Sequence, residues 1–224
     1  MTVRAAQCDS SPLAAYREDP LFFLLTLGAA ATSIAALLLQ VVGIIRMPYT
    51  LSFLTAPGMT FLLCVQVWAG RARRPLIVNR LRVGVAAGLI GLLAYNGTRW
   101  VLGIFLPSSP FYSIAIFGKL ITANPAESII ASVAGWLYHI SNGVTFGIIY
   151  TLILGPARWW FGLAWGLVLE LAMLIIYPAS TLLQPRALAP FVIVSLASHA
   201  LFGAVIGVIA QDHALARDSG MGHG

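Results

Sequence analysis

One segment of the sequence, Trp159–Pro178, limits most strongly what this chain can fold into. Its 20 residues are almost entirely apolar, and this length is enough to cross a bilayer as a single helix. Glu170 is the only charged side chain in the segment and lies near its middle. A charged carboxyl at the centre of a membrane helix costs about 2.5–3.5 kcal/mol on insertion. A partner side chain, a proton or a ligand must therefore offset the cost of burying Glu170.

The composition indicates an integral membrane protein. Of the 224 residues, 59% are hydrophobic and 9% are charged, whereas a soluble domain carries about 25% charged residues. The net charge of +6 does not indicate a nucleic-acid partner, because the basic residues concentrate in one loop, as membrane topology requires. The sequence has no nucleotide-binding loop and no motif for a serine or cysteine nucleophile. We therefore expect neither ATP-driven nor classical hydrolase activity from this chain alone.

Hydropathy and helix-breaking residues predict an all-α, polytopic membrane helix bundle with about six transmembrane helices. The predicted spans run from about Pro20 to Ile45, Leu51 to Ala69, Val83 to Leu106, Glu127 to Leu154, Trp159 to Pro178 and Pro190 to Gln211. Pro57-Gly58 should kink or break the second span. The apolar piece from Phe111 to Ile121 is too short to cross a bilayer and is typical of an interfacial or re-entrant segment.

Capping residues predict where two of these helices begin. Asp19 precedes a proline at the first helical position, Pro20, which is the usual order at an N-terminus. Asn124-Pro125-Ala126-Glu127 has the arrangement of a capping box and should open the fourth span. We expect a polar cytoplasmic tail at 1–19, one membrane domain at 20–211 and a disordered cytoplasmic tail at 212–224.

The distribution of basic residues predicts the orientation in the membrane. Nine fall on the side of the two tails: Arg4, Arg17, Arg71, Arg73, Arg74, Arg80, Arg82, Arg158 and Arg217. Three fall on the opposite side: Arg46, Lys119 and Arg186. Cytoplasmic loops carry the excess of Lys and Arg. Both termini are therefore expected in the cytoplasm, with the bundle in the inner (cytoplasmic) cell membrane.

Polar side chains from four predicted helices fall at a similar depth in the bilayer. At a rise of 1.5 Å per residue they share a layer about one to two helical turns thick: Asn96, Arg99, His139, Asn142, Glu170 and His199. Polar groups inside a membrane usually face a shared interior site. Three GxxxG pairs accompany them and indicate close helix packing: Gly143/Gly147, Gly162/Gly166 and Gly203/Gly207.

Structural explanations for the same residues remain open from the sequence. Glu170 and Arg99 could form a purely structural ion pair, or Arg99 could extend to the membrane surface. Each histidine could bond only to a backbone carbonyl or, for His199, to Ser195. The two asparagines could simply connect helices. A functional pocket explains all of these groups together, whereas the structural explanations treat each separately.

A recurring pattern runs through the last three spans. Its parts are His139-x-x-Asn142-Gly143…Phe146-Gly147-x-x-Tyr150, Trp160-x-Gly162-x-x-x-Gly166 and Ser198-His199-x-x-Phe202-Gly203-x-x-x-Gly207. Over about residues 135–210 this resembles small uncharacterised bacterial inner-membrane proteins, including the YagU type. The resemblance implies a membrane protein with paired histidines and brings no established reaction. In its architecture alone, the chain also looks like the substrate-binding component of an energy-coupling-factor transporter, which docks to a membrane partner protein.

Three kinds of function fit the polar layer. The first is binding or transport of a small solute, proton or cation by Asn96, Arg99, His139, Asn142, Glu170 and His199. The second is a membrane enzyme, either with a metal held by His139, Glu170 and His199 or with Glu170 as a general acid towards a lipid or isoprenoid substrate. The third is a structural or assembly protein whose polar layer only specifies helix packing. A membrane partner protein or a homo-oligomer is compatible with each of these functions. Haem held by the two histidines is a less favoured cofactor.

Overall fold

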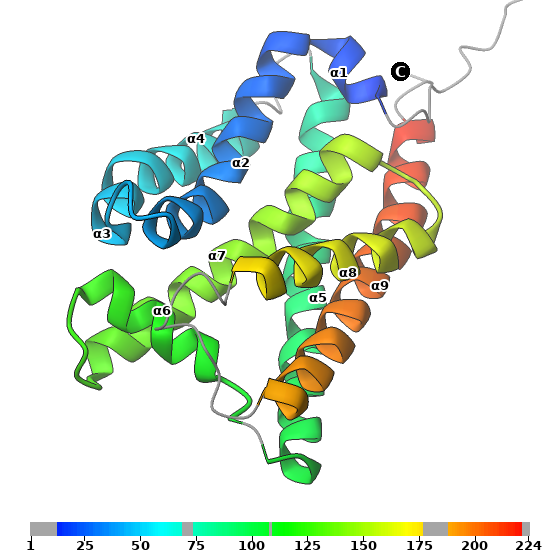
Figure 1. Ribbon diagram of the computed structural model, residues 1–224. Helices are drawn as coiled ribbons and strands as arrows, with labels where there is room; N and C mark the ends of the chain where they lie inside the picture. The colour runs from blue at the N-terminus through cyan, green and yellow to red at the C-terminus, as the bar shows by residue number, and fades with distance from the viewer. Residues whose placement is uncertain (1–12, 69–73, 108, 177–187, 221–224) are drawn as a thin grey trace, which may run out of the picture.

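The computed structural model describes residues 13–68, 74–107, 109–176 and 188–220, and every regular element in these ranges is a helix (Figure 1). Six helices in the described part are long and apolar enough to cross a membrane. They are α2 (Pro20–Val41), the continuous segment Met47–Val67, α5 (Pro75–Phe105), α7 (Ile129–Leu154), α8 (Trp159–Ile176) and the Ala189–His213 part of α9 (Leu188–Gly220). The predicted all-α bundle with six spans is confirmed.

Acidic side chains cap the first helices of the bundle. Asp19 Oδ1 accepts the backbone N–H three residues on, at 3.0 Å, which confirms the predicted N-cap of α2. Glu18 lies at the end of the short helix α1 (Ala14–Glu18). Its two oxygens accept the backbone N–H groups of Leu76 and Ile77 at 3.0 and 2.9 Å. Glu18 therefore caps α5, about 60 residues away along the chain, and joins α1 to the bundle.

The second span is one continuous helix despite its proline. α3 (Met47–Thr50) runs through a π-helical turn, η1 (Leu51–Thr55), into α4 (Ala56–Trp68). A proline removes a backbone N–H and clashes with the carbonyl of the preceding turn. The π turn ends two residues before Pro57 and includes Phe53, whose carbonyl is the one that a proline at position 57 would meet. Of the two outcomes expected at Pro57-Gly58, a kink or a break, the break does not occur. The span also begins four residues earlier than expected.

The third span begins at Pro75 rather than Val83, so two arginines assigned to the basic loop belong to helix α5. Arg80 is fully buried, and its Nη1 donates to the carbonyl oxygen of Leu152 at 3.3 Å. That carbonyl belongs to the last turn of α7, where helices lack internal donors. Arg82 on the next turn is exposed. Arg80 therefore stabilises a helix end inside the protein, and only Arg82 lies at the surface.

The fourth span begins after Ser128, not at the predicted capping box. Ser128 Oγ accepts the backbone N–H of Ala131 at 3.1 Å. Asn124 instead closes a local turn, and Glu127 pairs with Lys119 at 3.2 Å. Before this turn, the short apolar piece forms the helix α6 (Tyr112–Thr122), whose 11 residues are too few to cross a bilayer. The predicted capping box is therefore wrong, and a single serine N-cap four residues further on begins the helix.

The last two spans differ from the predictions at their ends. α8 ends at Ile176 in the described part of the chain, and the predicted end at Tyr177-Pro178 lies outside the described residues. α9 continues to Gly220, past the predicted end at Gln211. The helix therefore includes most of the segment expected to be a disordered tail.

α5 lies at the centre of the bundle, with α7 packed on one side and α9 on another (Figure 1). α8 packs on α9, while α6 and α2 pack on α7. Two antiparallel contacts use glycines on both helices: Gly84 and Gly88 of α5 lie against Gly143 and Gly147 of α7, and Gly162 and Gly166 of α8 lie against Gly203 and Gly207 of α9. All three predicted glycine pairs are confirmed as close contacts.

Candidate functional site

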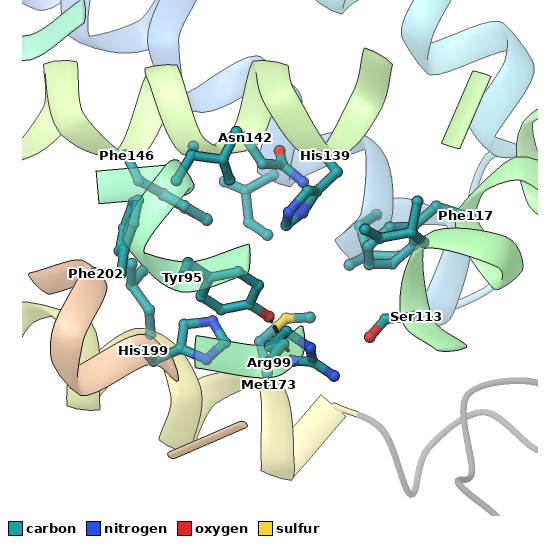
Figure 2. Close-up of a pocket in the computed structure, with 16 residues that line it drawn as sticks. Tyr95, Arg99, Ser113, Phe117, His139, Asn142, Phe146, Met173, His199 and Phe202 are labelled. Atoms are coloured by element: carbon teal, nitrogen blue, oxygen red, sulfur yellow. Dashed lines mark hydrogen bonds between the residues drawn. The ribbon is translucent and has the colours of Figure 1, made fainter. Parts of the chain in front are cut away.

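A pocket of about 60 Å³ lies inside the bundle and is lined by residues of α2, α5, α6, α7, α8 and α9 (Figure 2). A water molecule needs about 10–15 Å³ measured in this way, so the pocket can hold a few waters or one small solute. Its polar lining residues are Tyr95, Arg99, Ser113, His139, Asn142 and His199. Apolar side chains such as Phe117, Phe146, Met173 and Phe202 form the rest of the wall. No acidic residue lines this pocket within the described part of the chain.

The structure brings most of the predicted polar layer together. Four of its six residues line the pocket: Arg99, His139, Asn142 and His199. The other two, Asn96 and Glu170, lie behind the wall and bond to the histidines in front of them. The predicted layer therefore consists of two shells. Arg99, His139, Asn142 and His199 line the pocket, and Asn96 and Glu170 lie behind the histidines.

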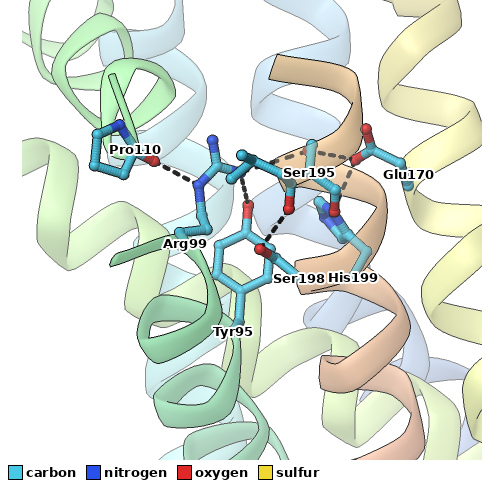
Figure 3. Close-up of polar contacts among 8 residues, drawn as sticks. Tyr95, Arg99, Pro110, Glu170, Ser195, Ser198 and His199 are labelled. Atoms are coloured by element: carbon cyan, nitrogen blue, oxygen red, sulfur yellow. Dashed lines mark hydrogen bonds and ion pairs between the residues drawn. The ribbon is translucent and has the colours of Figure 1, made fainter. Parts of the chain in front are cut away.

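Glu170 is 1% exposed and faces α9. Its Oε2 lies 2.7 Å from His199 Nδ1 and accepts a hydrogen bond from Ser195 Oγ at 2.8 Å (Figure 3). Nδ1 also lies 3.0 Å from the carbonyl oxygen of Ser195, which can only accept. We therefore assign the Nδ1 proton to these two acceptors. The partner that offsets the cost of the buried carboxyl is His199.

Arg99 is buried, with 2% of its surface exposed, so the expectation that it reaches the membrane surface is wrong. Its Nε donates to the carbonyl oxygen of Pro110, and its Nη1 donates to Tyr95 Oη at 2.6 Å and to Ser195 Oγ at 3.4 Å. The direct Arg99–Glu170 ion pair considered from the sequence is not formed. Ser195 lies between them, accepting from the guanidinium and donating to the carboxylate (Figure 3).

Arg99 also carries an unmet hydrogen-bonding group. Its Nη2 is buried and has no partner within the described part of the chain. An unpaired buried donor costs about 1–3 kcal/mol, and more when it is charged. In Figure 2 the guanidinium lies at the end of the pocket occupied by Ser113 and Met173. A water or a solute in the pocket would supply the missing acceptor.

Tyr95 is the central pocket residue that the sequence reasoning missed. Its ring lies between the two imidazoles, with centroids 5.4 Å from His139 and 4.9 Å from His199 (Figure 2). The signal was present in the sequence, because Tyr95 is one helical turn before Arg99 and shares its face. The tyrosine ring occupies the space that a haem would need between two axial histidines.

The second imidazole belongs to a separate set of contacts. His139 Nε2 lies 3.0 Å from Asn96 Oδ1, and its ring stacks edge-on against Trp136. Asn142, one turn further, accepts a hydrogen bond from Ser33 of α2 at 2.6 Å. Asn96 therefore positions a histidine, and Asn142 connects α7 to α2 while also lining the pocket.

The three predicted metal ligands do not come together. No group of three His, Cys, Asp or Glu side chains suited to a metal ion occurs among the described residues. Glu170 and His199 are in contact, whereas His139 lies on the far side of the Tyr95 ring. The arrangement is a buried acid–histidine pair beside a pocket with a guanidinium and a second imidazole.

Helices α7 and α9 present their histidines in the same way. Both carry a histidine followed by two glycines at intervals of four: His139, Gly143 and Gly147 in α7, and His199, Gly203 and Gly207 in α9. Each glycine pair contacts an antiparallel helix, α5 for the pair in α7 and α8 for the pair in α9. The same spacing therefore places each imidazole one turn beyond a close helix crossing, at the level of the pocket.

Comparisons with known proteins identify a family but no activity. No curated protein matches the chain, and no solved structure matches it either. A family model described as "Family of unknown function (DUF6789)" matches residues 78–219, which run from the first turn of α5 into the last turn of α9. This match supports a group of uncharacterised proteins but not the resemblance to the YagU type. Because the model covers more than half of the sequence, the chain belongs to this family of unknown function.

Proposed function

We propose that this multi-pass membrane protein binds or transports a small anionic solute in the pocket around Arg99. The pocket wall carries one permanent positive charge and several hydrogen-bonding groups, and none of its described residues is acidic. A cation would meet the guanidinium without a carboxylate to coordinate it. An anion would receive a charge-assisted hydrogen bond, about twice as strong as a neutral one. The wall therefore favours an anion over the cation considered from the sequence.

The observation that carries this proposal is the unpaired Nη2 of Arg99 beside a small pocket. The guanidinium is otherwise fully engaged with Pro110, Tyr95 and Ser195, which hold it in one orientation. A donor fixed in this way loses little side-chain entropy when a ligand binds. The pocket volume of about 60 Å³ limits the solute to a few heavy atoms.

The general-acid alternative has less support. Glu170 Oε2 is occupied by two donors, and the residue does not line the pocket. A general acid must reach the group that it protonates, directly or through one water.

The cellular location proposed with the binding function is the inner membrane, with both termini in the cytoplasm.

Thermal unfolding of the purified protein in detergent tests the proposal. Sodium acetate, nitrate and chloride should raise the midpoint, whereas sodium gluconate at the same ionic strength is too large and should not. A ligand at 100 times its Kd stabilises by about 2.7 kcal/mol. Arg99→Gln should abolish the response, and Arg82→Gln, the same change at an exposed arginine, should keep it. Equal midpoints in all four sodium salts would refute anion binding. Choline gluconate or ammonium gluconate stabilising the protein as much as sodium acetate does would also refute it, because these salts vary only the cation.

A further inference from the structure

His199 is held so that its two ring nitrogens have different roles. Nδ1 faces α8 and donates towards Glu170 Oε2 at 2.7 Å and the Ser195 carbonyl at 3.0 Å. With Nδ1 protonated, Nε2 of a neutral imidazole is a proton acceptor. The ring lines the pocket, so Nε2 is the nitrogen available on the pocket side (Figure 2). A buried carboxylate thus orients a basic nitrogen towards the proposed anion site.

The charges around the pocket are balanced before an anion binds. With Glu170 as the carboxylate, Arg99 contributes one positive charge and Glu170 one negative charge, and Ser195 connects them by hydrogen bonds of 3.4 and 2.8 Å. With His199 neutral, this group has no net charge. An added anion would leave one uncompensated negative charge in a low-dielectric interior, which is costly. A proton taken up by His199 would restore neutrality.

We infer that the site takes up a proton together with its anion: when a small anion binds beside Arg99, His199 Nε2 gains one H⁺ from the buffered bulk solution. This inference rests on the proposed function and adds a proton as the second species that the site takes up. The product is an imidazolium whose Nδ1–H donates to Glu170 and whose Nε2–H faces the bound anion. The substrate class is therefore a small monovalent anion together with H⁺, such as the anion of a short weak acid.

The groups around the imidazole favour His199 over His139 as the proton acceptor. α8 supplies Glu170 in direct contact, α5 supplies Tyr95 and Arg99, and α7 supplies His139 across the tyrosine ring. His139 has a neutral amide, Asn96, as its partner instead of a carboxylate. An imidazolium at position 199 would be paired with a carboxylate, whereas one at 139 would have only a neutral amide as its hydrogen-bond partner.

Calorimetry of acetate binding in two buffers with different ionisation enthalpies measures the proton directly. The wild-type protein should take up close to one proton per acetate at any pH at which His199 is neutral in the unliganded protein. Linkage then requires the acetate Kd to rise about tenfold per pH unit in that range. His199→Gln should bind acetate without proton uptake and with a Kd that is flat with pH. His213→Gln, at an exposed position of α9, is the matched control and should behave as wild type.

The outcomes separate this inference from the proposed function. Acetate binding to the wild type without proton uptake, and with a pH-independent Kd between pH 6 and 9, would overturn the inference and leave anion binding intact. The same conclusion follows if His139→Gln removes the uptake while His199→Gln keeps it. No binding of acetate, nitrate or chloride would refute the proposed function itself. The wild-type measurement decides the case even if a variant fails to fold.

Discussion

Replacing Gly166 by alanine tests whether the α8–α9 contact positions the acid–histidine pair. A Cβ at Gly166 would lie 2.0 Å from the carbonyl oxygen of His199 and 3.1 Å from the Cα of Gly203. Both atoms belong to backbone, so no side-chain rotation can relieve the overlap. α8 must move away from α9 by about 1 Å to bring the new contact to 3.0 Å, the lower limit for real Cβ atoms.

The same movement weakens the interaction between Glu170 and His199. These residues lie on the two helices that separate, and their 2.7 Å contact would lengthen to about 3.7 Å, beyond hydrogen-bonding distance. Overpacking typically costs about 1–3 kcal/mol, and a lost hydrogen bond to a charged group about 1.5–3 kcal/mol. The higher helix propensity of alanine offsets at most about 1 kcal/mol of this destabilisation. We therefore expect a net destabilisation of about 2–4 kcal/mol.

Thermal unfolding in detergent measures this effect against a matched control. Gly97→Ala makes the same chemical change within α5, where nothing lies within 4 Å of the added Cβ. Its midpoint should equal or slightly exceed that of the wild type, because only helix propensity changes. Gly166→Ala should melt several degrees lower and, if it binds acetate, should show reduced proton uptake. Equal midpoints for the two variants would refute the close α8–α9 packing and the positioning of Glu170 that depends on it.

Two further predictions concern other parts of the structure. Tyr95→Phe removes the hydroxyl that accepts from Arg99 Nη1 at 2.6 Å, and should destabilise the protein by about 1–3 kcal/mol; an unchanged melting midpoint would contradict the placement of this bond. The pKa of Asp19 is lowered from its ordinary value of 3.8, first by the backbone N–H of Phe22 and then by Arg74. Its stabilising effect is therefore complete above about pH 4 and is lost as the pH falls through the lowered pKa. Acid titration of the melting midpoint should show a smaller decrease for Asp19→Asn than for the wild type, and parallel curves would argue against this cap.

Several features were predicted from the sequence because the residues that indicate them lie close together in the chain. Asp19 before Pro20 marked the start of α2 correctly, since the cap bond spans three residues. The glycine pairs marked the close helix contacts, since only glycine lets backbones meet at these distances. The start of α5 was placed too late because Arg80 looks like a loop charge. Its acceptor, the carbonyl of Leu152, lies 72 residues away in sequence.

By itself, the sequence determined a six-span helical membrane bundle with a layer of polar groups at one depth. Apolar length and helix rise set that depth, and neither requires tertiary information. Only the tertiary structure decided which partner Glu170 takes, because Arg99 and His199 lie at equivalent levels. α9 packs against both α5 and α8, so the carboxyl of α8 meets His199 directly and reaches Arg99 only through Ser195. Because of the order of helices around α9, Glu170 forms a buried acid–histidine pair instead of the arginine–glutamate pair that the sequence left open.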